Sequence, residues 1–389
     1  MIKKEGISLT TIYLIRHAQA EGNLYRRCHS WHNGLITVKG RTQIEALERR
    51  FDGVHIDAVY SSDLYRTMTT ARAIYRPRNL PLRVDRELRE IGAGAWEDVP
   101  WGQLLHDHRD SLAAFLTCDP GWQVEGSETH PQVRERMRAA IGRIAAAHPD
   151  QTVAVVSHGC AIRCALSVFL GLEPEQISQI PLGNNTSVSK LEENNGQIKV
   201  IYYNDEDHLT DHSIPKASTL YGMAGMERNA LRFQPLLLPQ ERESYLAARR
   251  DGWMASHGTM DGFDGESFLR VAEQNSAHAP ESVVVALLGD TPVGILQMDW
   301  VQDAELRVGR VPFFYMMPDF RSKGLGVQLL GHAVCTYRAK GRQFLRLRCA
   351  PENDRARKFY HSHGFYKIGE EHGGIGHLDT MEKYIGLEL

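Results

Sequence analysis

Short apolar runs alternate with amphipathic helical patterns along the first half of the chain. Residues 11–15 and 152–156 are rich in apolar and β-branched side chains, which predicts buried strands. Apolar positions at helical spacing predict a helix over 37–51, with Thr37 as its N-cap. Alternation of this kind is typical of a mainly parallel sheet covered by helices. The same reasoning predicts further strands at 58–60, 188–192 and 198–203 and further helices at 64–75, 133–147 and 161–170.

A second folding unit is predicted in the second half of the chain. The alternating pattern stops between 204 and about 225, where polar residues, glycine and proline predominate, as in a linker. Helices are then predicted at 240–256 and 266–276, followed by a hairpin of strands at 283–288 and 293–300. A strand, helix, strand, helix and strand complete this half, which is therefore mixed α/β. A chain of 389 residues exceeds one ordinary core, and we assign the first domain to 1–207, a linker to 208–227 and the second domain to 228–389.

Composition narrows the class of protein. The formal net charge is -3, which gives no general attraction to nucleic acid or to an anionic membrane. The six cysteines are scattered without a C-x-x-C pair, which favours a reducing cytoplasm over a disulfide framework or a zinc site. No apolar stretch reaches the roughly 20 residues of a membrane helix, and the first residues do not resemble a signal peptide. We expect a cytoplasmic protein that binds neither nucleic acid nor membrane, while its oligomeric state cannot be read from the sequence.

Reactive side chains follow the predicted strands of the first half. The first predicted strand leads directly into Arg16 and His17, and the strand that ends at residue 156 leads into His158. Ligands bind at the carboxyl ends of parallel strands, so we expect the two histidines to share one site. Segments that follow other strands add two more candidates, Arg66 and Glu90.

These residue types together can transfer a phosphoryl group. A neutral imidazole attacks phosphorus and forms a covalent phosphohistidine, which water then hydrolyses. Arginines supply paired donors to the phosphoryl oxygens. A carboxylate protonates the leaving alkoxide and later activates water, while a second histidine donates to the same oxygens. This chemistry needs no metal, and we predict none.

The motifs that carry these residues resemble the histidine phosphatase superfamily, which includes the cofactor-dependent phosphoglycerate mutases, over about residues 8–205. The resemblance implies a three-layer α/β/α fold of the phosphoglycerate mutase type. It also implies that His17 is the nucleophile, Glu90 the proton donor and His158 the second histidine of the pocket. The phosphate-binding arginines and the substrate-binding residues that it implies are, respectively, Arg16 and Arg66, and Asn23 and Gly159.

Phosphatases and mutases of this superfamily share this chemistry. The mutases carry a longer insert between the acid and the second histidine, whereas only 68 residues separate Glu90 from His158, which favours a phosphatase. We expect segments 21–33 and 96–116 to border the substrate pocket, with Arg26 and Arg27 as candidates to meet a second anionic group. Five histidines match no motif position, and we interpret them as surface or substrate-loop residues: His29, His32, His106, His108 and His130.

A glycine-bearing turn in the second half is a candidate pyrophosphate site. A predicted strand at 311–317 leads into this turn, and a predicted helix at 327–340 follows it. Successive backbone amides at the start of a helix, together with the helix dipole, favour a phosphate group. The Arg-x-x-Gly-x-Gly spacing is neither that of a P-loop nor that of a Rossmann fingerprint. Its residues are Arg321, Ser322, Lys323, Gly324, Leu325 and Gly326.

Together with the segment at 351–365, this turn resembles the GNAT-type N-acetyltransferases, over about residues 228–389. The resemblance implies that the turn binds the pyrophosphate of acetyl-CoA, that Asn353 lies near the pantetheine and that Tyr360 protonates the departing thiolate. It also offers Glu305 as a candidate general base, although Pro312 interrupts the central strand and predicts a bulge there. A base that acts through water is an equal alternative, and the acceptor amine is not indicated.

The sequence therefore predicts a bifunctional enzyme acting on small molecules. One half is a metal-independent phosphomonoesterase and the other an acetyl-CoA-dependent N-acetyltransferase, and one metabolite with a phosphate and an amine would serve both. Two alternatives stay open. The first half would be a phosphoryl mutase, or the second half would bind CoA without catalysis and regulate the phosphatase.

Overall fold

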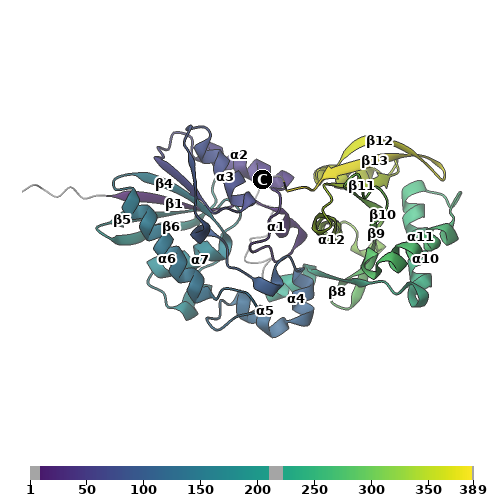
Figure 1. Cartoon of the computed structure of the whole chain (residues 1–389), viewed down its shortest axis with the longest axis horizontal. Helices are drawn as coiled ribbons and strands as arrows, with labels where there is room; N and C mark the ends of the chain where they lie inside the picture. The colour runs from purple at the N-terminus through teal and green to yellow at the C-terminus, as the bar shows by residue number, and fades with distance from the viewer. Residues whose placement is uncertain (1–8, 210–221, 388–389) are drawn as a thin grey trace, which may run out of the picture. The chain divides into compact units, whose positions relative to one another are not determined.

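Backbone contacts divide the chain into two compact units in a computed structural model that describes residues 9–209 and 222–387 (Figure 1). The predicted linker at 208–227 falls largely on residues 210–221, which lie outside the described residues. Two short pieces of the first half group with the second unit. The first unit comprises Met1–Asn23, Arg27–Val99 and Asp107–Met226, and the second comprises Leu24–Arg26, Pro100–His106 and Glu227–Leu389.

A six-stranded sheet of order β3-β2-β4-β1-β5-β6 forms the centre of the first unit. The first four strands of that order are parallel, and β5 and β6 return antiparallel beside β1. Strand β3 was not predicted from the sequence, because its three residues are too few for a periodic signal. The strands are β1 (Thr10–Arg16), β2 (Ala58–Ser61), β3 (Leu82–Val84), β4 (Thr152–Ser157), β5 (Val188–Asn194) and β6 (Gln197–Asp205).

Helices cover both faces of this sheet, α2 and α3 on one and α6 and α7 on the other (Figure 1). On the first face, Leu47, Phe51 and Ile74 pack against Ile15 and Val156 of the sheet. The predicted three-layer α/β/α fold is thus confirmed. The helices of the first half are α1 (Glu21–Tyr25), α2 (Val38–Arg50), α3 (Tyr65–Tyr75), α4 (Trp101–Asp107), α5 (Arg109–Leu116), α6 (His130–Ala147) and α7 (Gly159–Phe169), with 3-10 turns η1 (Arg86–Leu88), η2 (Gly94–Trp96) and η3 (Pro174–Gln179).

The second unit is built on a seven-stranded sheet of order β12-β13-β11-β10-β9-β8-β7. All neighbouring strands are antiparallel except β10 and β11, which are parallel. The prediction that this half begins with two helices was wrong, because β7 precedes them and pairs with β8. A hairpin of β12 and β13 likewise replaces the single last strand that was predicted. The strands are β7 (Leu231–Pro235), β8 (Val283–Leu288), β9 (Thr291–Asp299), β10 (Val308–Met316), β11 (Phe344–Cys349), β12 (Tyr366–Gly373) and β13 (Gly376–Tyr384).

Both faces of the second sheet are covered, as the alternation of its side chains requires. Along β8, Val283 and Val285 pack with α10 and α11, whereas Val284 and Ala286 pack with α12. Successive side chains of a strand point to opposite faces, so a run of apolar residues serves two cores. The helices are α9 (Met223–Asn229), α10 (Leu238–His257), α11 (Gly265–His278), α12 (Gly326–Ala339) and α13 (Asp354–Ser362), with 3-10 turns η4 (Pro280–Ser282) and η5 (Pro318–Phe320). Within the described ranges, no helix is both long and apolar enough to cross a membrane.

Candidate functional site

The ends of two adjacent parallel strands bring His17 and His158 together. In the register of β1 with β4, Arg16 lies opposite Ser157, so each histidine is the next residue beyond a paired position. The His17 amide donates to the Ser157 carbonyl at 3.0 Å. The imidazole centroids lie 5.2 Å apart, and both side chains are buried. Topology therefore places the two histidines in one site at the carboxyl edge of the sheet.

The His17 imidazole is neutral and has one defined tautomer. Burial lowers its pKa well below 6.5, and the charges of Arg66 and Arg16 lower the pKa further. Its Nδ1 lies 2.7 Å from the Ala18 carbonyl oxygen. Because a carbonyl can only accept, Nδ1 carries the proton, and Nε2 keeps the lone pair that a nucleophile needs.

Two buried guanidinium groups accompany His17. Arg66 is only 2% exposed, and it donates to the backbone carbonyls of Ser30 and His32. Arg16 is also buried and donates to the Gly183 carbonyl. Burial lowers the pKa of Arg66 to about 10, which leaves it charged at neutral pH. Two buried guanidinium groups beside one imidazole suit an anion such as a phosphoryl group.

His158 is neutral for the same reason as His17, since burial and Arg66 lower its pKa well below 6.5. Its Nε2 lies 2.7 Å from the Ser62 hydroxyl. No hydrogen-bond partner for its Nδ1 occurs among the described residues. A buried ring nitrogen of this kind is a group that a bound ligand can satisfy.

The Glu90 carboxylate lies at the start of α7, directly after His158. It accepts hydrogen bonds from the amides of Cys160 and Ala161, at 3.1 and 2.9 Å, and from its neighbour Ile91 at 3.0 Å. Carboxylates are favoured at helix N-termini because the first amides there have no partner within the helix. The structure thus brings Glu90 to the same strand end as the two histidines.

Asn23 and Gly159 occupy supporting positions. The Asn23 side-chain oxygen accepts from the Ala20 amide at 3.1 Å and lies 3.4 Å from the Asn185 amide nitrogen, which also donates to the His17 carbonyl. A Cβ at Gly159 would lie 3.2 Å from Nε of Arg16, so glycine leaves room for that guanidinium. Asn23 therefore contacts the site through Asn185, and Gly159 lies against the Arg16 side chain.

Several residues that hold the site were not found in the sequence. Arg136 of α6 donates to the carbonyls of Glu87, Arg89 and Glu90 at 2.8–2.9 Å and forms two bonds of 2.8 Å with the Glu128 carboxylate. Thr186 is buried at φ +65°, a rare conformation for a β-branched residue, and its amide donates to the Arg16 carbonyl. An arginine whose partners are mostly carbonyls leaves no sequence motif, and a strained φ leaves none either.

The proposed second anion site is not supported by the arginines predicted for it. Nε of Arg27 lies 2.7 Å from the Asp98 carboxylate, and Arg26 donates to the carbonyl of Asn229. Arg89 is likewise paired with Asp63, at 2.5 Å. All three guanidinium groups therefore bind oxygen atoms of the protein itself.

In the second unit, the parallel strands β10 and β11 pair from Val308 to Val311. A register shift between Arg310 and Phe313 on the β9 side confirms the bulge predicted at Pro312. Beside the last part of β10 lies a cavity of about 330 Å³, lined by Phe314, Tyr315, Met316, Phe320, Arg321, Ser322, Gly324, Gly326, Asn353, Phe359 and Tyr360 among others. The predicted pyrophosphate turn therefore borders a cavity.

The backbone of this turn has the shape that an anion-binding turn needs. Ser322 and Gly324 both have positive φ, at +61° and +71°, and Gly326 begins the 14-residue helix α12. Amides at such a turn point toward the loop interior and toward a bound phosphate. The Arg321 side chain is held by the Asp251 carboxylate and the Met316 carbonyl, so it shapes the turn. The amides and the cavity fit the diphosphate of a CoA ester.

Tyr360 and Asn353 line this cavity and a second one beside it. Tyr360 is 6% exposed, and burial raises its pKa well above 10, so the phenol stays protonated. Asn353 caps α13 by accepting from the Ala356 amide at 3.1 Å. Glu305, the candidate general base, is exposed in the turn before β10 and lines neither of these two cavities, so the structure does not bring it together with Tyr360 and Asn353.

Comparisons with known proteins agree with this geometry. A profile of the Histidine phosphatase superfamily (branch 1) matches residues 12–206, just over half of the chain, and a profile of the Acetyltransferase (GNAT) family matches residues 242–365. The chain is 28% identical over 205 residues to the probable phosphoglycerate mutase GpmB of Proteus mirabilis, covering 51% of this chain and 95% of that protein. The Yersinia enterocolitica protein of the same name is 28% identical over 181 residues, covering 46% of this chain and 84% of that protein. Among solved structures, Bacillus stearothermophilus YhfR is similar with a TM-score of 0.50 and 28% identity, covering 51% of this chain and 98% of that one.

The fusion predicted from the motifs is thus confirmed, with each family profile matching a different half of the chain. The chain is an enzyme that belongs to the histidine phosphatase superfamily and carries a GNAT-family acetyltransferase domain in its second half.

Proposed function

We propose that the chain hydrolyses phosphomonoesters through a phosphohistidine at His17 and transfers acetyl groups from acetyl-CoA to an amine at its second site. The observation that carries the first activity is the neutral His17 imidazole, whose Nδ1 is bound to the Ala18 carbonyl beside two buried arginines. Both substrates are small molecules. The cytoplasmic location expected from the cysteine usage stays a prediction.

The phosphatase cycle uses the side chains at the two strand ends. Nε2 of His17 attacks phosphorus, and the bond from phosphorus to the leaving oxygen breaks while Glu90 donates a proton to that oxygen. Arg16 and Arg66 balance the charge of the phosphoryl oxygens, and Nδ1 of His158 donates to one of them. Water then attacks the phosphohistidine and returns a proton to Glu90. One ester and one water give one alcohol and one phosphate, and no group is oxidised or reduced.

Removal of the nucleophile tests this proposal. In the His17→Ala variant, we expect phosphate release from phosphomonoesters to fall at least about a thousandfold, the order of loss when a covalent nucleophile is removed. His55→Ala is the matched control, since His55 lies in the same unit and its side chain is 83% exposed. Equal rates for His17→Ala and wild type would mean that another residue attacks phosphorus.

A phosphoryl mutase is the second candidate function, because the GpmB relatives are named probable phosphoglycerate mutases. A mutase must hold a substrate with two anionic groups and return the phosphoryl group to it. Arg27, a predicted partner for the second group, is paired with Asp98, which favours hydrolysis. With 3-phosphoglycerate as substrate, free phosphate in excess of 2-phosphoglycerate supports the phosphatase. The reverse ratio supports the mutase.

For acetyl transfer, we propose that the turn at 321–326 and the adjoining cavity hold acetyl-CoA, which supplies the acetyl thioester. The amine forms a bond to the acetyl carbonyl carbon, the bond from that carbon to sulfur breaks, and Tyr360 protonates the sulfur, while the proton that the amine loses passes to water. The raised pKa of Tyr360 keeps the phenol protonated at neutral pH, so it holds a proton to donate. Thiol release from acetyl-CoA is measured for the wild type and for the Tyr360→Phe variant. Release that depends on Tyr360 supports acetyl transfer over the alternative in which CoA binds only to regulate the phosphatase. Regulation alone predicts CoA-dependent phosphatase rates without thiol release.

The second cavity indicates the class of acceptor. It has a volume of about 200 Å³, and its charged lining residues are basic, namely Arg249 and Arg348. No carboxylate occurs among its lining residues, so we propose an acceptor amine that also carries an acidic group. Acetylation of an amino acid should therefore exceed that of its carboxamide, and Arg348→Met should reduce this preference. If one metabolite serves both sites, the phosphorylated amine will be a substrate in both assays.

A further inference from the structure

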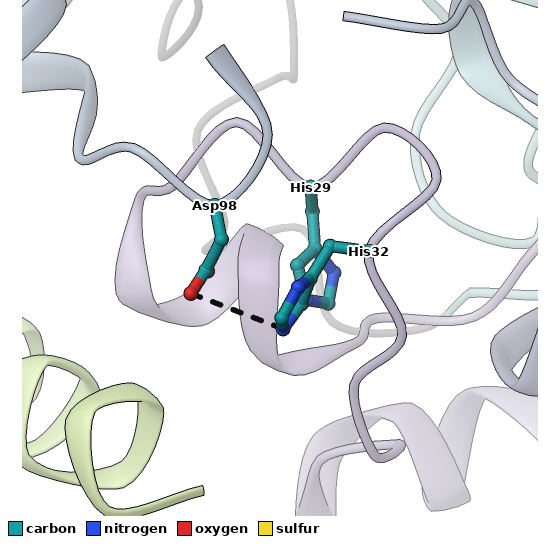
Figure 2. A group of neighbouring side chains, drawn as sticks. All are labelled: His29, His32 and Asp98. Atoms are coloured by element: carbon teal, nitrogen blue, oxygen red, sulfur yellow. Dashed lines mark ion pairs between the residues drawn. The ribbon is translucent and has the colours of Figure 1, made fainter. Parts of the chain in front are cut away.

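Three side chains outside the phosphoryl-transfer set converge on one point of the first unit. His29 and His32 lie in the loop after α1, and Asp98 lies in the loop after η2 (Figure 2). One donor atom of each lies within 4.8 Å of the other two, and all three residues are half-buried. We propose that His29, His32 and Asp98 bind a divalent transition-metal ion of the Zn²⁺ class, and that this ion holds the loop on which Arg66 rests.

The donor set fits such an ion. Two imidazoles and one carboxylate are common protein ligands of zinc and of neighbouring first-row metals, and three protein ligands leave a position open for water. Bonds of about 2.0–2.1 Å in a tetrahedral site place ligand atoms roughly 3.4 Å apart. His32 Nε2 and Asp98 Oδ2 are already 3.8 Å apart. The other ligand atoms are at most 4.8 Å apart, so the remaining closure is at most about 1.4 Å.

Two glycines make room for the His29 ring. A Cβ at Gly22 would lie 2.1 Å from Cγ of His29, and a Cβ at Gly34 would lie 2.3 Å from its Cε1. Any other residue at either position would displace the imidazole, because real Cβ contacts essentially never fall below 3.0 Å. The His29 ring therefore packs against the backbone of Gly22 and Gly34, which has no side chain to displace it.

The position of Asp98 is also fixed. Its φ is +57°, and its amide donates to the Cys28 carbonyl at 2.7 Å, which ties it to the residue before His29. Arg27 donates to both carboxylate oxygens, from Nε to Oδ1 at 2.7 Å and from Nη2 to Oδ2 at 3.4 Å, and Oδ2 lies 3.8 Å from Nε2 of His32. Arg27 therefore orients the carboxylate with Oδ2 toward His32, as outer partners of metal ligands commonly do. Its positive charge also lowers the affinity, which suits reversible binding.

The loop that carries both histidines touches the phosphatase site. The carbonyls of Ser30 and His32 accept from Arg66, and the amides of Trp31 and His32 donate to the Glu97 carboxylate at 2.9–3.0 Å. Glu97 directly precedes Asp98, so an ion would bridge the two segments that this carboxylate already joins. We expect the ion to fix the Arg66 guanidinium and to lower KM for phosphomonoesters. The ion takes no part in the bond changes at phosphorus, so hydrolysis continues without it.

The test uses the full chain, stripped of metal by chelation, and Co²⁺ as a coloured substitute for Zn²⁺. We expect saturable binding of Co²⁺, with visible absorption of nitrogen and oxygen ligation, and displacement by Zn²⁺. His32→Gln and Asp98→Asn should each weaken binding by at least about tenfold, while circular dichroism shows that both variants are folded. His55→Gln is the matched control, because His55 is paired with Asp57 at 2.8 Å and its side chain is 83% exposed.

Affinities of His32→Gln and Asp98→Asn equal to that of wild type, or no saturable binding by wild type, would overturn the site. Unchanged KM on saturation with metal, despite binding at these residues, would overturn the link to Arg66. Neither result tests the proposal that His17 is the nucleophile, because that proposal is tested by the loss of turnover in His17→Ala.

Discussion

We predict that Arg136 positions the general acid Glu90 by holding the backbone of the segment that carries it. Its side chain is 13% exposed and donates to the carbonyls of Glu87, Arg89 and Glu90 as well as to the Glu128 carboxylate. The segment that carries Glu90 is thus held from the α6 side. Arg136→Met keeps the apolar stem and removes all of these bonds.

The structure sets the size of the expected effect. Each hydrogen bond to a charged group contributes about 1.5–3 kcal/mol, and removal of one partner from a buried pair costs about 3–5 kcal/mol. The five bonds share one guanidinium and are not additive, so we expect the first unit to lose about 3–5 kcal/mol of unfolding free energy. A shift of a catalytic group by about 1 Å costs roughly a hundredfold in rate. We therefore expect kcat for an alkyl phosphate to fall about a hundredfold.

The choice of substrate separates positioning from general damage. An alkyl alkoxide needs the proton that Glu90 supplies, whereas p-nitrophenolate is a weak base and leaves without it. We expect a much smaller loss of kcat with p-nitrophenyl phosphate, measured beside the alkyl ester in steady-state assays. Arg138→Met is the control on the same helix, since both side chains of its pair with Glu135 are exposed and solvent screens their interaction. Equal losses of kcat with both esters would refute the positioning role.

Three further predictions follow from burial and packing. Folding lowers the pKa values of His17 and His158, so just below pH 6.5 these two imidazoles bind protons in the unfolded chain but not in the folded one. Urea titrations should therefore show that the free energy of unfolding falls as pH drops from about 7 to 5.5, with a shallower slope in His158→Asn. A slope that is unchanged in His158→Asn would contradict the buried neutral state. Tyr360→Phe should reduce kcat for acetyl transfer by about a hundredfold with little change in KM for acetyl-CoA, whereas Tyr366→Phe, an exposed tyrosine, should not; equal rates would exclude Tyr360 as the acid. Gly309→Ala should lower the melting temperature, because its Cβ would lie 2.3 Å from the buried Tyr337 ring and overpacking costs about 1–3 kcal/mol, whereas Gly369→Ala meets no atom within 4 Å and should melt like wild type.

The elements that position the candidate site were largely predictable from sequence because they rest on local patterns. Apolar β-branched runs predict β1 and β4, and residues directly after such strands lie at one edge of the sheet, which brings His17 and His158 together. Thr37 was predicted as an N-cap, and its hydroxyl accepts from the Gly40 amide at 3.0 Å. The turn before α12 was predicted as a pyrophosphate site from its position between a strand and a helix, and in the structure it borders a cavity.

What could not be predicted depends on contacts between distant segments. Arg136 acts through carbonyls of residues 46–49 positions away, and a carbonyl has no sequence signature. His29, His32 and Asp98 share no motif, since the fold of two loops brings them together. Glu305 was expected at the start of the central strand, whereas β10 begins at Val308, because strand ends are weakly encoded in the sequence.

The central claim is that His17 carries the phosphoryl group. The most direct measurement mixes enzyme with excess phosphomonoester, quenches the reaction in alkaline denaturant during turnover and maps modified peptides by mass spectrometry. We predict one phosphoryl group on the peptide that contains His17, sensitive to acid and absent from His17→Ala. Phosphorylation of a different residue, or turnover without any phosphorylated peptide, would contradict the account.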